Sequence, residues 1–399
     1  MVRSALVVGE VALAFVLAIG AGLLLKSFQS LNAVNPGFEP AGVLTFQLSL
    51  PPARYQDVRD STAFYERLMD NLRSLPGVSS VGAMSGLPPV REIDANDTDF
   101  EGVPQPPDGP IHNVAYYNAV AGDYFATLKV PLLAGRWFEP ADVESSTPVV
   151  VVNQRLAEVF WPQENPVGKR MRPYFTANTP WFTVIGVVGN LKQGGLNQPS
   201  GTELFVLNRQ VALLEGVAYR TLNLAVRTSG DPLALASAVR GEVAKLDPAL
   251  PVASLQPLDR VVSASTADPR LLTLLVAMFG VLSLVLAAVG TYGVLSYAVE
   301  ERRHELGVRL ALGSETSGLL GLVLGRGLAW VGIGLVLGLG GAALATRMLS
   351  TLLFEVAPSD PLTWSAVAAL LVVVAVAACL APALRAARVD PVVVLRSEG

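Results

Sequence analysis

The sequence contains one cysteine, Cys379, and two histidines, His112 and His304, among 399 residues. A single cysteine excludes a disulfide framework within the chain and a zinc site built on several cysteines. Two histidines leave little for a histidine-based metal site. The net charge of −4 supplies no basic field for nucleic acid. We therefore predict no metal site and no nucleic-acid partner.

Motifs for catalysis and nucleotide binding are missing as well. The sequence has no Walker A motif, no G-x-S-x-G and no H-E-x-x-H. Gly168-Lys169 is similar to part of a phosphate loop, but no Ser or Thr follows the lysine. We therefore predict that this chain has no catalytic residues, is not an enzyme and binds no cofactor.

Charge is scarce, at 16% of residues against about 25% in soluble domains, because four long runs exclude it. The runs are Ser4–Leu25, Leu271–Val299, Leu319–Thr346 and Leu362–Leu384. Each is long enough to cross a bilayer, which takes about 20 residues. The charges within the runs are Glu10 and Arg326. Snorkelling or a structural pair is the favoured interpretation of both, and a transport pathway is the alternative.

The basic residues that flank the runs predict the orientation in the membrane. Seven lie on one side: Arg3, Arg302, Arg303, Arg309, Arg385, Arg388 and Arg396. Lys26 and Arg347 lie on the other side. We expect an uncleaved first helix, cytoplasmic termini and an inner (plasma) membrane location. The long segment between the first two runs is then extracytoplasmic, which means periplasmic in a Gram-negative cell.

The long segment has the pattern of two separated βαβ-like units. The first combines strand Val43–Leu50, helix Ser61–Leu75 and strand Val78–Met84, and the second combines strand Leu222–Arg227, helix Pro232–Leu246 and strand Val252–Leu255. Asp231-Pro232 is typical of a helix start, as are Asp268-Pro269 and Asp360-Pro361 before the second and fourth runs. We expect one split α+β subdomain.

The residues between these units predict an inserted, strand-rich subdomain over His112–Arg209, with strands Pro148–Val152 and Phe182–Val188. Residues Gly86–Pro110 are expected to form a long surface loop. Its acidic run of Asp94, Asp97, Asp99 and Glu101 is either a calcium loop or a solvated loop. The missing EF-hand spacing favours the solvated loop.

Glycines in the third run recur at the spacing that brings membrane helices close together. The pairs are Gly321 with Gly325 and Gly334 with Gly338. We interpret them as contacts within a bundle or a dimer, and ordinary glycine enrichment of membrane helices is the alternative.

The segment Glu300–Ser314, EERRHELGVRLALGS, lies between the second and third runs. It resembles the E-R-x-x-E-I-G-I-R-x-A-L-G-A pattern of the MacB/FtsX-type ABC transporter permeases. The tail Pro382–Pro391 is also similar to that family, and Gly135–Phe138 and Asn165–Arg170 resemble its MacB-type periplasmic core domain. The order of these motifs, together with the layout of one span followed by three, makes the resemblance specific.

The resemblance implies an α-helical membrane protein with four transmembrane helices and a large α+β extracytoplasmic domain. The expected domains are an N-terminal transmembrane helix at 1–26, a MacB-like core domain at 27–268 and an FtsX-like permease domain at 269–399. The permease domain includes a cytoplasmic coupling loop at 300–318. One chain supplies only four spans, so we expect a homodimer or a second permease module.

The resemblance also implies that the loop docks on a separate cytoplasmic ABC ATPase, which binds the ATP. The expected coupling residues are Glu301, Arg302, Glu305, Leu306, Gly307, Arg309, Leu310, Ala311, Leu312 and Gly313. Glu305 and Arg309 are expected to position the docked loop by charge pairing, although such an i,i+4 pair also simply stabilises a helix. Leu306 and Leu310 are expected to fill a groove on the ATPase.

The expected function is to transmit ATP-driven motion to the outer domain for efflux of a drug, peptide, lipoprotein or toxin, with a periplasmic or outer-membrane partner. The alternative is an orphan signalling or scaffold protein whose outer domain regulates an extracytoplasmic partner such as a cell-wall hydrolase. The start, Ser4–Leu13, and Leu50–Tyr55 resemble the second half of the duplicated orphan permeases of acidobacteria. The chain is accordingly either one module or part of a longer chain. It either has an ATPase partner or, like many of those orphan permeases, has none.

Overall fold

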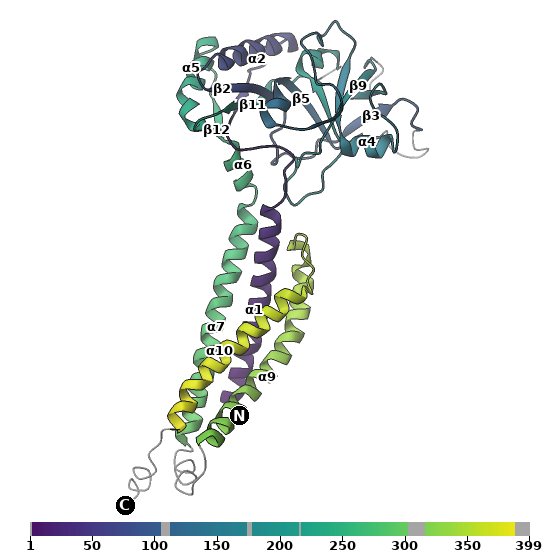
Figure 1. Cartoon of the computed structure of the whole chain (residues 1–399). Helices are drawn as coiled ribbons and strands as arrows, with labels where there is room; N and C mark the ends of the chain where they lie inside the picture. The colour runs from purple at the N-terminus through teal and green to yellow at the C-terminus, as the bar shows by residue number, and fades with distance from the viewer. Residues whose placement is uncertain (1, 105–111, 174–177, 215–216, 302–315, 388–399) are drawn as a thin grey trace, which may run out of the picture. The chain divides into compact units, whose positions relative to one another are not determined.

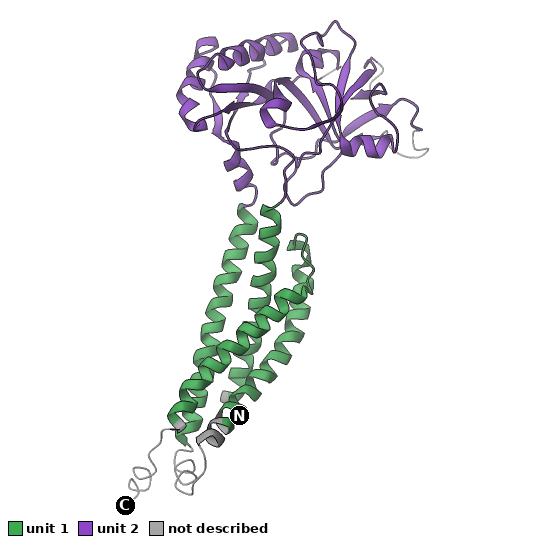
Figure 2. Cartoon of the chain, in the orientation of Figure 1, with its two compact units in different colours: residues 1–33, 267–399 green, residues 34–266 purple. Residues whose placement is uncertain are grey.

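The structure, a computed structural model, describes residues 2–104, 112–173, 178–214, 217–301 and 316–387. It consists of two compact units (Figure 2). Unit 1 combines Met1–Ala33 with Ala267–Gly399, and unit 2 is Val34–Thr266. The predicted domain boundary at residue 26 therefore falls inside the first helix of unit 1.

Among its described residues, unit 1 contains four long helices (Figure 1). They are α1 (Val2–Asn32), α7 (Ala267–Glu301), α9 (Thr316–Leu349) and α10 (Pro361–Ala387), with a short 3-10 helix, η3, at Ser350–Leu352. Each contains a stretch that is long and apolar enough to cross a membrane. All four expected runs are thus helical, and each helix extends beyond its run.

The two expected helix starts in unit 1 have different outcomes. At α10, the Thr363 backbone N–H donates to Asp360 Oδ2 at 3.0 Å, as expected of an N-cap. At α7 the expectation is wrong, because the helix already begins at Ala267 and Asp268 lies in its first turn. There the carboxylate complements the helix dipole instead of capping the helix.

The α1 helix contacts α7, α9 and α10, and its span is the most buried of the four candidate spans. Its side chains Val11, Phe15, Ile19 and Leu23 are almost fully buried. These residues follow the i, i+4 spacing of one helix face. The other helices carry many exposed apolar side chains, as expected of surfaces that face lipid.

Unit 2 contains one mixed sheet of twelve strands, in the order β12-β1-β11-β2-β5-β10-β7-β9-β8-β3-β4, with β6 paired to β9. The strands are β1 (Val43–Ser49), β2 (Val78–Met84), β3 (Asn96–Phe100), β4 (Asn113–Val114), β5 (Tyr116–Gly122), β6 (Leu132–Gly135), β7 (Val149–Asn153), β8 (Arg170–Pro173), β9 (Phe182–Val188), β10 (Glu203–Leu207), β11 (Thr221–Thr228) and β12 (Ala253–Pro257). The helices are α2 (Val58–Arg73), α3 (Tyr124–Leu128), α4 (Gln154–Phe160), η1 (Asn208–Leu213), η2 (Pro232–Leu235), α5 (Ala236–Leu246) and α6 (Leu258–Ala264).

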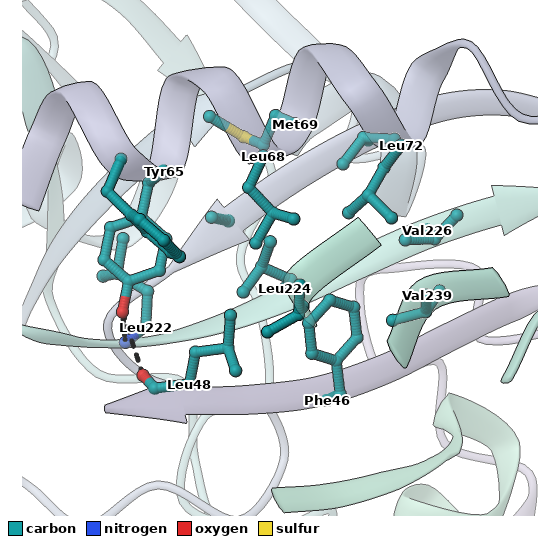
Figure 3. Packing of buried hydrophobic residues seen from close by; sticks show 14 of the residues in the cluster. Phe46, Leu48, Tyr65, Leu68, Met69, Leu72, Leu222, Leu224, Val226 and Val239 are labelled. Carbon is teal, nitrogen blue, oxygen red and sulfur yellow. Dashed lines mark hydrogen bonds between the residues drawn. The ribbon is translucent and has the colours of Figure 1, made fainter. Parts of the chain in front are cut away.

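Alternating side chains of β1 and β11 build cores on both faces of the sheet. Phe46, Leu48 and Leu224 pack with α2 and α5 on one face (Figure 3). Val43 and Ala225 pack with α3 and α6 on the other. This period of two is the alternation that a half-buried strand requires. A third cluster lies under α4 and joins β5, β7, β9 and β10.

The expected secondary structure of the two βαβ-like units agrees with the structure to within a few residues. Asp231 caps η2, which continues into α5. The division into two subdomains stays a prediction, because β2 pairs with β5 and the sheet runs without a break from one part into the other.

The expectation of a surface loop over Gly86–Pro110 is wrong in part, since it contains strand β3 with buried Thr98 and Phe100. Residues 105–110 lie outside the described residues. The acidic run lies against arginines: Asp94 pairs with Arg91, Asp99 with Arg172 and Glu101 with Arg170. These guanidiniums neutralise the carboxylates, whereas in a calcium loop the carboxylates stay unpaired and bind the Ca²⁺ ion.

Candidate functional site

The second glycine pair of α9 lies directly against α1. A Cβ added at Gly334 would lie 2.8 Å from Cβ of Val11, and one at Gly338 would lie 2.9 Å from Cβ of Phe15. The backbone carbonyls of Val8 and Ala12 are also within 3.1 Å of these positions. Because real Cβ atoms do not approach so closely, the two helices can pack at this distance only with glycine there.

The first glycine pair has a different environment. A Cβ at Gly321 or at Gly325 would meet no other atom of the described residues within 4 Å. The structure thus brings Gly334 and Gly338 into a helix contact within the chain and leaves Gly321 and Gly325 on an open side of α9.

Glu10 in α1 lies against α7. A Cβ at Gly290 would overlap Glu10 Oε2, so this glycine makes room for the carboxylate. Among the described residues, Oε2 has no hydrogen-bond partner. The Arg326 side chain lies outside the described residues, so the expected charge pair stays a prediction.

Polar contacts join the far end of α1 to α10 and to the segment before it. Lys26 Nζ lies 2.8 Å from Asp360 Oδ1, and the Phe354 N–H donates to Ser27 Oγ at 2.8 Å. The Lys26 ammonium and the Thr363 hydroxyl, both hydrogen-bonded to Asp360, lower the pKa of this carboxyl to about 2. Lys26 was predicted only as an indicator of orientation; its pairing with Asp360, 334 residues away, was not predicted.

At the opposite end of unit 1, Glu301 is the last residue of α7 and is exposed. Arg385 of α10 donates to the Tyr292 hydroxyl of α7 at 2.6 Å near the same end. The other expected coupling residues, from Arg302 to Gly313, lie outside the described residues. Their docking role stays a prediction.

Unit 2 contains a buried polar cluster around Glu203, the first residue of β10, which is fully buried. Its Oε1 accepts hydrogen bonds from the side chains of Asn118 and Gln193. Its backbone N–H donates to Asn153 Oδ1 at 3.0 Å. Arg91 closes the cluster by donating to Asn118 Oδ1 and by pairing with Asp94 at 2.5 Å.

Burial raises the pKa of Glu203 to about 8, because the charged form loses its hydration. The nearby Arg91 charge and the two amide hydrogen bonds oppose this rise, and Asp94 adds to it. Near neutral pH the side chain is therefore mostly a neutral acid. A lone charge at the start of an otherwise apolar strand is the sequence signal for this residue, and the sequence-based prediction did not include it.

A third polar feature joins α2 to segments that follow it in the chain. Arg209 pairs with Glu66 of α2, Arg59 pairs with Glu144, and Arg73 Nε lies 3.1 Å from Asp123 Oδ2. These pairs connect the predicted split subdomain to the predicted inserted one. None of the three could be predicted from the sequence, because each joins residues that lie far apart in the chain.

Two family models match the chain. The MacB-like periplasmic core domain matches residues 4–242, and the FtsX-like permease C-terminal domain matches residues 277–391. The chain belongs to the MacB/FtsX-type permeases. The resemblance seen in the sequence motifs is thereby confirmed.

Relatives of this permease include two proteins named macrolide export ATP-binding/permease protein MacB. The one from Rhodospirillum rubrum is 28% identical over 69% of this chain and 42% of its own length. The one from Azoarcus sp. is 26% identical over 98% of this chain and 56% of its own length. The pyoverdine export ATP-binding/permease protein PvdT of Pseudomonas savastanoi is 25% identical over 80% of this chain and 48% of its own length. The permease thus spans about half the length of these relatives.

Proposed function

We propose that this chain is the permease part of an ATP-driven exporter, moved by a separate cytoplasmic ABC ATPase that docks on the loop after α7. Membership of the MacB/FtsX-type permeases supports this role. The relatives are named for ATP binding, permease function and export. This sequence contains no Walker A motif, so we assign ATP binding to the other subunit.

The observation that carries the proposal is the unbroken length of α7. Its 35 residues correspond to about 52 Å, well beyond the hydrocarbon thickness of about 30 Å. The described helix reaches Glu301, within the predicted coupling loop at 300–318, and starts at Ala267, directly after the last residue of unit 2. A continuous helix passes on a displacement of one end to the other, which is what such an exporter needs.

The orientation and the assembly are part of the same proposal. The seven basic residues on one flank support a cytoplasmic loop and cytoplasmic termini, with unit 2 on the periplasmic side of the inner (plasma) membrane. Four candidate spans per chain support a homodimer or a second permease module.

Charge reversal in the loop tests the proposal. The full chain carrying Arg309→Glu is compared with Arg347→Glu, the same change on the proposed outer flank. We expect Arg309→Glu to lower co-purification of the ABC ATPase and stimulation of ATP hydrolysis by about tenfold or more, since a misplaced charge at a contact costs several kcal/mol. Arg347→Glu should leave both unchanged. Equal behaviour of the two variants would contradict the docking role.

A further inference from the structure

Two adjoining cavities in unit 2 form a cleft beside α2. The larger, of about 320 Å³, is lined by α2, the end of β5 and the segments 138–140 and 207–209. The smaller, of about 210 Å³, is lined by Val120 and by residues 122–126 and 137–138. Both are bordered by Gly122, Asp123 and Phe138, so we treat them as one site, the α2 cleft. Its size is that of a small-molecule pocket.

The larger cavity has an excess of negative charge. Four carboxylates line it, from Glu66, Asp70, Asp123 and Glu139, against the two guanidiniums of Arg73 and Arg209.

Three of these carboxylates form close ion pairs, and the fourth, Glu139, has only a long one. Arg73 pairs with Asp70 at 2.7 Å and with Asp123 at 3.1 Å, and Arg209 pairs with Glu66. The ion pair of Glu139 with Arg136 is 3.9 Å long, and Arg136 binds Asp142 more closely, at 2.8 Å. Glu139 is therefore available to a cation from outside.

The smaller cavity is bordered by aromatic rings. The ring centroids of Phe125 and Trp137 are 4.7 Å apart and nearly parallel, and Phe138 extends the stack at 6.2 Å from Phe125. Trp137 and Phe138 are partly exposed. Such rings attract flat apolar groups and also cations, through the negative charge of their faces.

We propose that the α2 cleft binds a small amine that carries an aromatic or other flat apolar group. The ammonium lies among the carboxylates near Glu139, and the apolar group lies against Phe138 and Trp137. The excess of carboxylates disfavours an anion of the same shape. That such an amine is cargo rests on the proposed function, whereas binding to unit 2 does not.

Binding is measured on the full chain in lipid nanodiscs without an ATPase. The result therefore tests the binding site alone and does not depend on whether the proposed export function is correct. The probes are tryptamine and indole-3-propionate, which share the indole ring and differ in charge, and empty nanodiscs of the same lipid are the blank. By titration calorimetry we expect tryptamine to bind about tenfold more tightly or better than indole-3-propionate, with a preference that falls as salt is added.

Two matched substitutions locate the site. Glu139 and Glu164 have side chains of almost equal exposure, 59% and 58%, and Glu164 lines neither cavity. We expect Glu139→Gln to weaken tryptamine binding about fivefold or more, because a charge-assisted contact is lost, and Glu164→Gln to leave it unchanged. Equal binding of the two probes, or equal effects of the two substitutions, would overturn the proposal.

Discussion

The buried carboxyl of Glu203 should make the stability of unit 2 depend on pH. In the folded protein its pKa is about 8, whereas the ordinary value is 4.5. Between these values the folded state keeps the proton and the unfolded state releases it. Stability from this group is therefore complete below pH 4.5 and is lost as the pH rises through 8.

The structure sets the size of the effect. The difference between the two pKa values corresponds to about 5 kcal/mol over the whole range. Between roughly pH 5.5 and 7.5 one proton is released on unfolding, so the free energy of unfolding falls by about 1.4 kcal/mol per pH unit. Glu203→Gln keeps an oxygen that accepts hydrogen bonds from Asn118 and Gln193, but its side chain does not ionise. The free energy of unfolding of this variant should therefore lack the pH dependence that Glu203 causes.

Urea unfolding of the full chain in detergent micelles measures the difference. Trp137, Trp161 and Trp181 lie in unit 2 and report its unfolding by fluorescence. The free energies of wild type and Glu203→Gln are compared at several pH values, which cancels the contributions of all other titrating groups. Parallel pH profiles for the two proteins would refute the argument, because Glu203 would then be charged in the folded state.

Two further predictions follow from close contacts in the two units. Gly338→Ala puts a Cβ 2.9 Å from Phe15 Cβ, so we expect thermal unfolding in detergent to show a loss of about 1–3 kcal/mol. Gly325→Ala, with open space around it, is the control, and an equal loss there would contradict the packing argument. Tyr65→Phe removes a hydroxyl that donates to the carbonyl of Leu48 or of Arg220, each at 2.9 Å, and accepts from the Leu222 N–H (Figure 3). We expect urea unfolding of unit 2 to show that the free energy of unfolding falls by about 1–3 kcal/mol. Tyr55→Phe, whose hydroxyl makes a single side-chain bond to Asp247, should cost less, and an equal loss would count against this account.

Local patterns in the sequence predicted the elements of the fold well. The apolar runs predicted all four long helices, and the predicted strands Val78–Met84 and Phe182–Val188 have the observed bounds of β2 and β9. Both signals lie within a single element, so they do not depend on the fold around them. The start of α7 was wrong because Asp268-Pro269 fits a first turn as well as a cap.

Long-range partners could not be predicted in this way. Arg91 and Glu203 are separated by more than a hundred residues, and they share one cluster because β10 lies parallel to β5 in the sheet. A stretch rich in Pro, Asp and Gly was therefore interpreted as a solvated loop, although β3 and Arg91 lie in it. The pairing of Arg209 with Glu66 escaped notice for the same reason.

The contacts of α1 determine how unit 1 can respond to a displacement at the end of α7. Gly334 and Gly338 hold α9 against α1, Glu10 fits the space at Gly290 of α7, and Lys26 binds Asp360 before α10. Because packed helices do not deform gradually, sliding α7 along α1 would move Gly290 away and remove the space that it leaves for the Glu10 carboxylate. Moving the four helices together breaks none of these contacts. We therefore expect motion imposed at Glu301 to tilt the bundle as one body, with α1 carried along with α7.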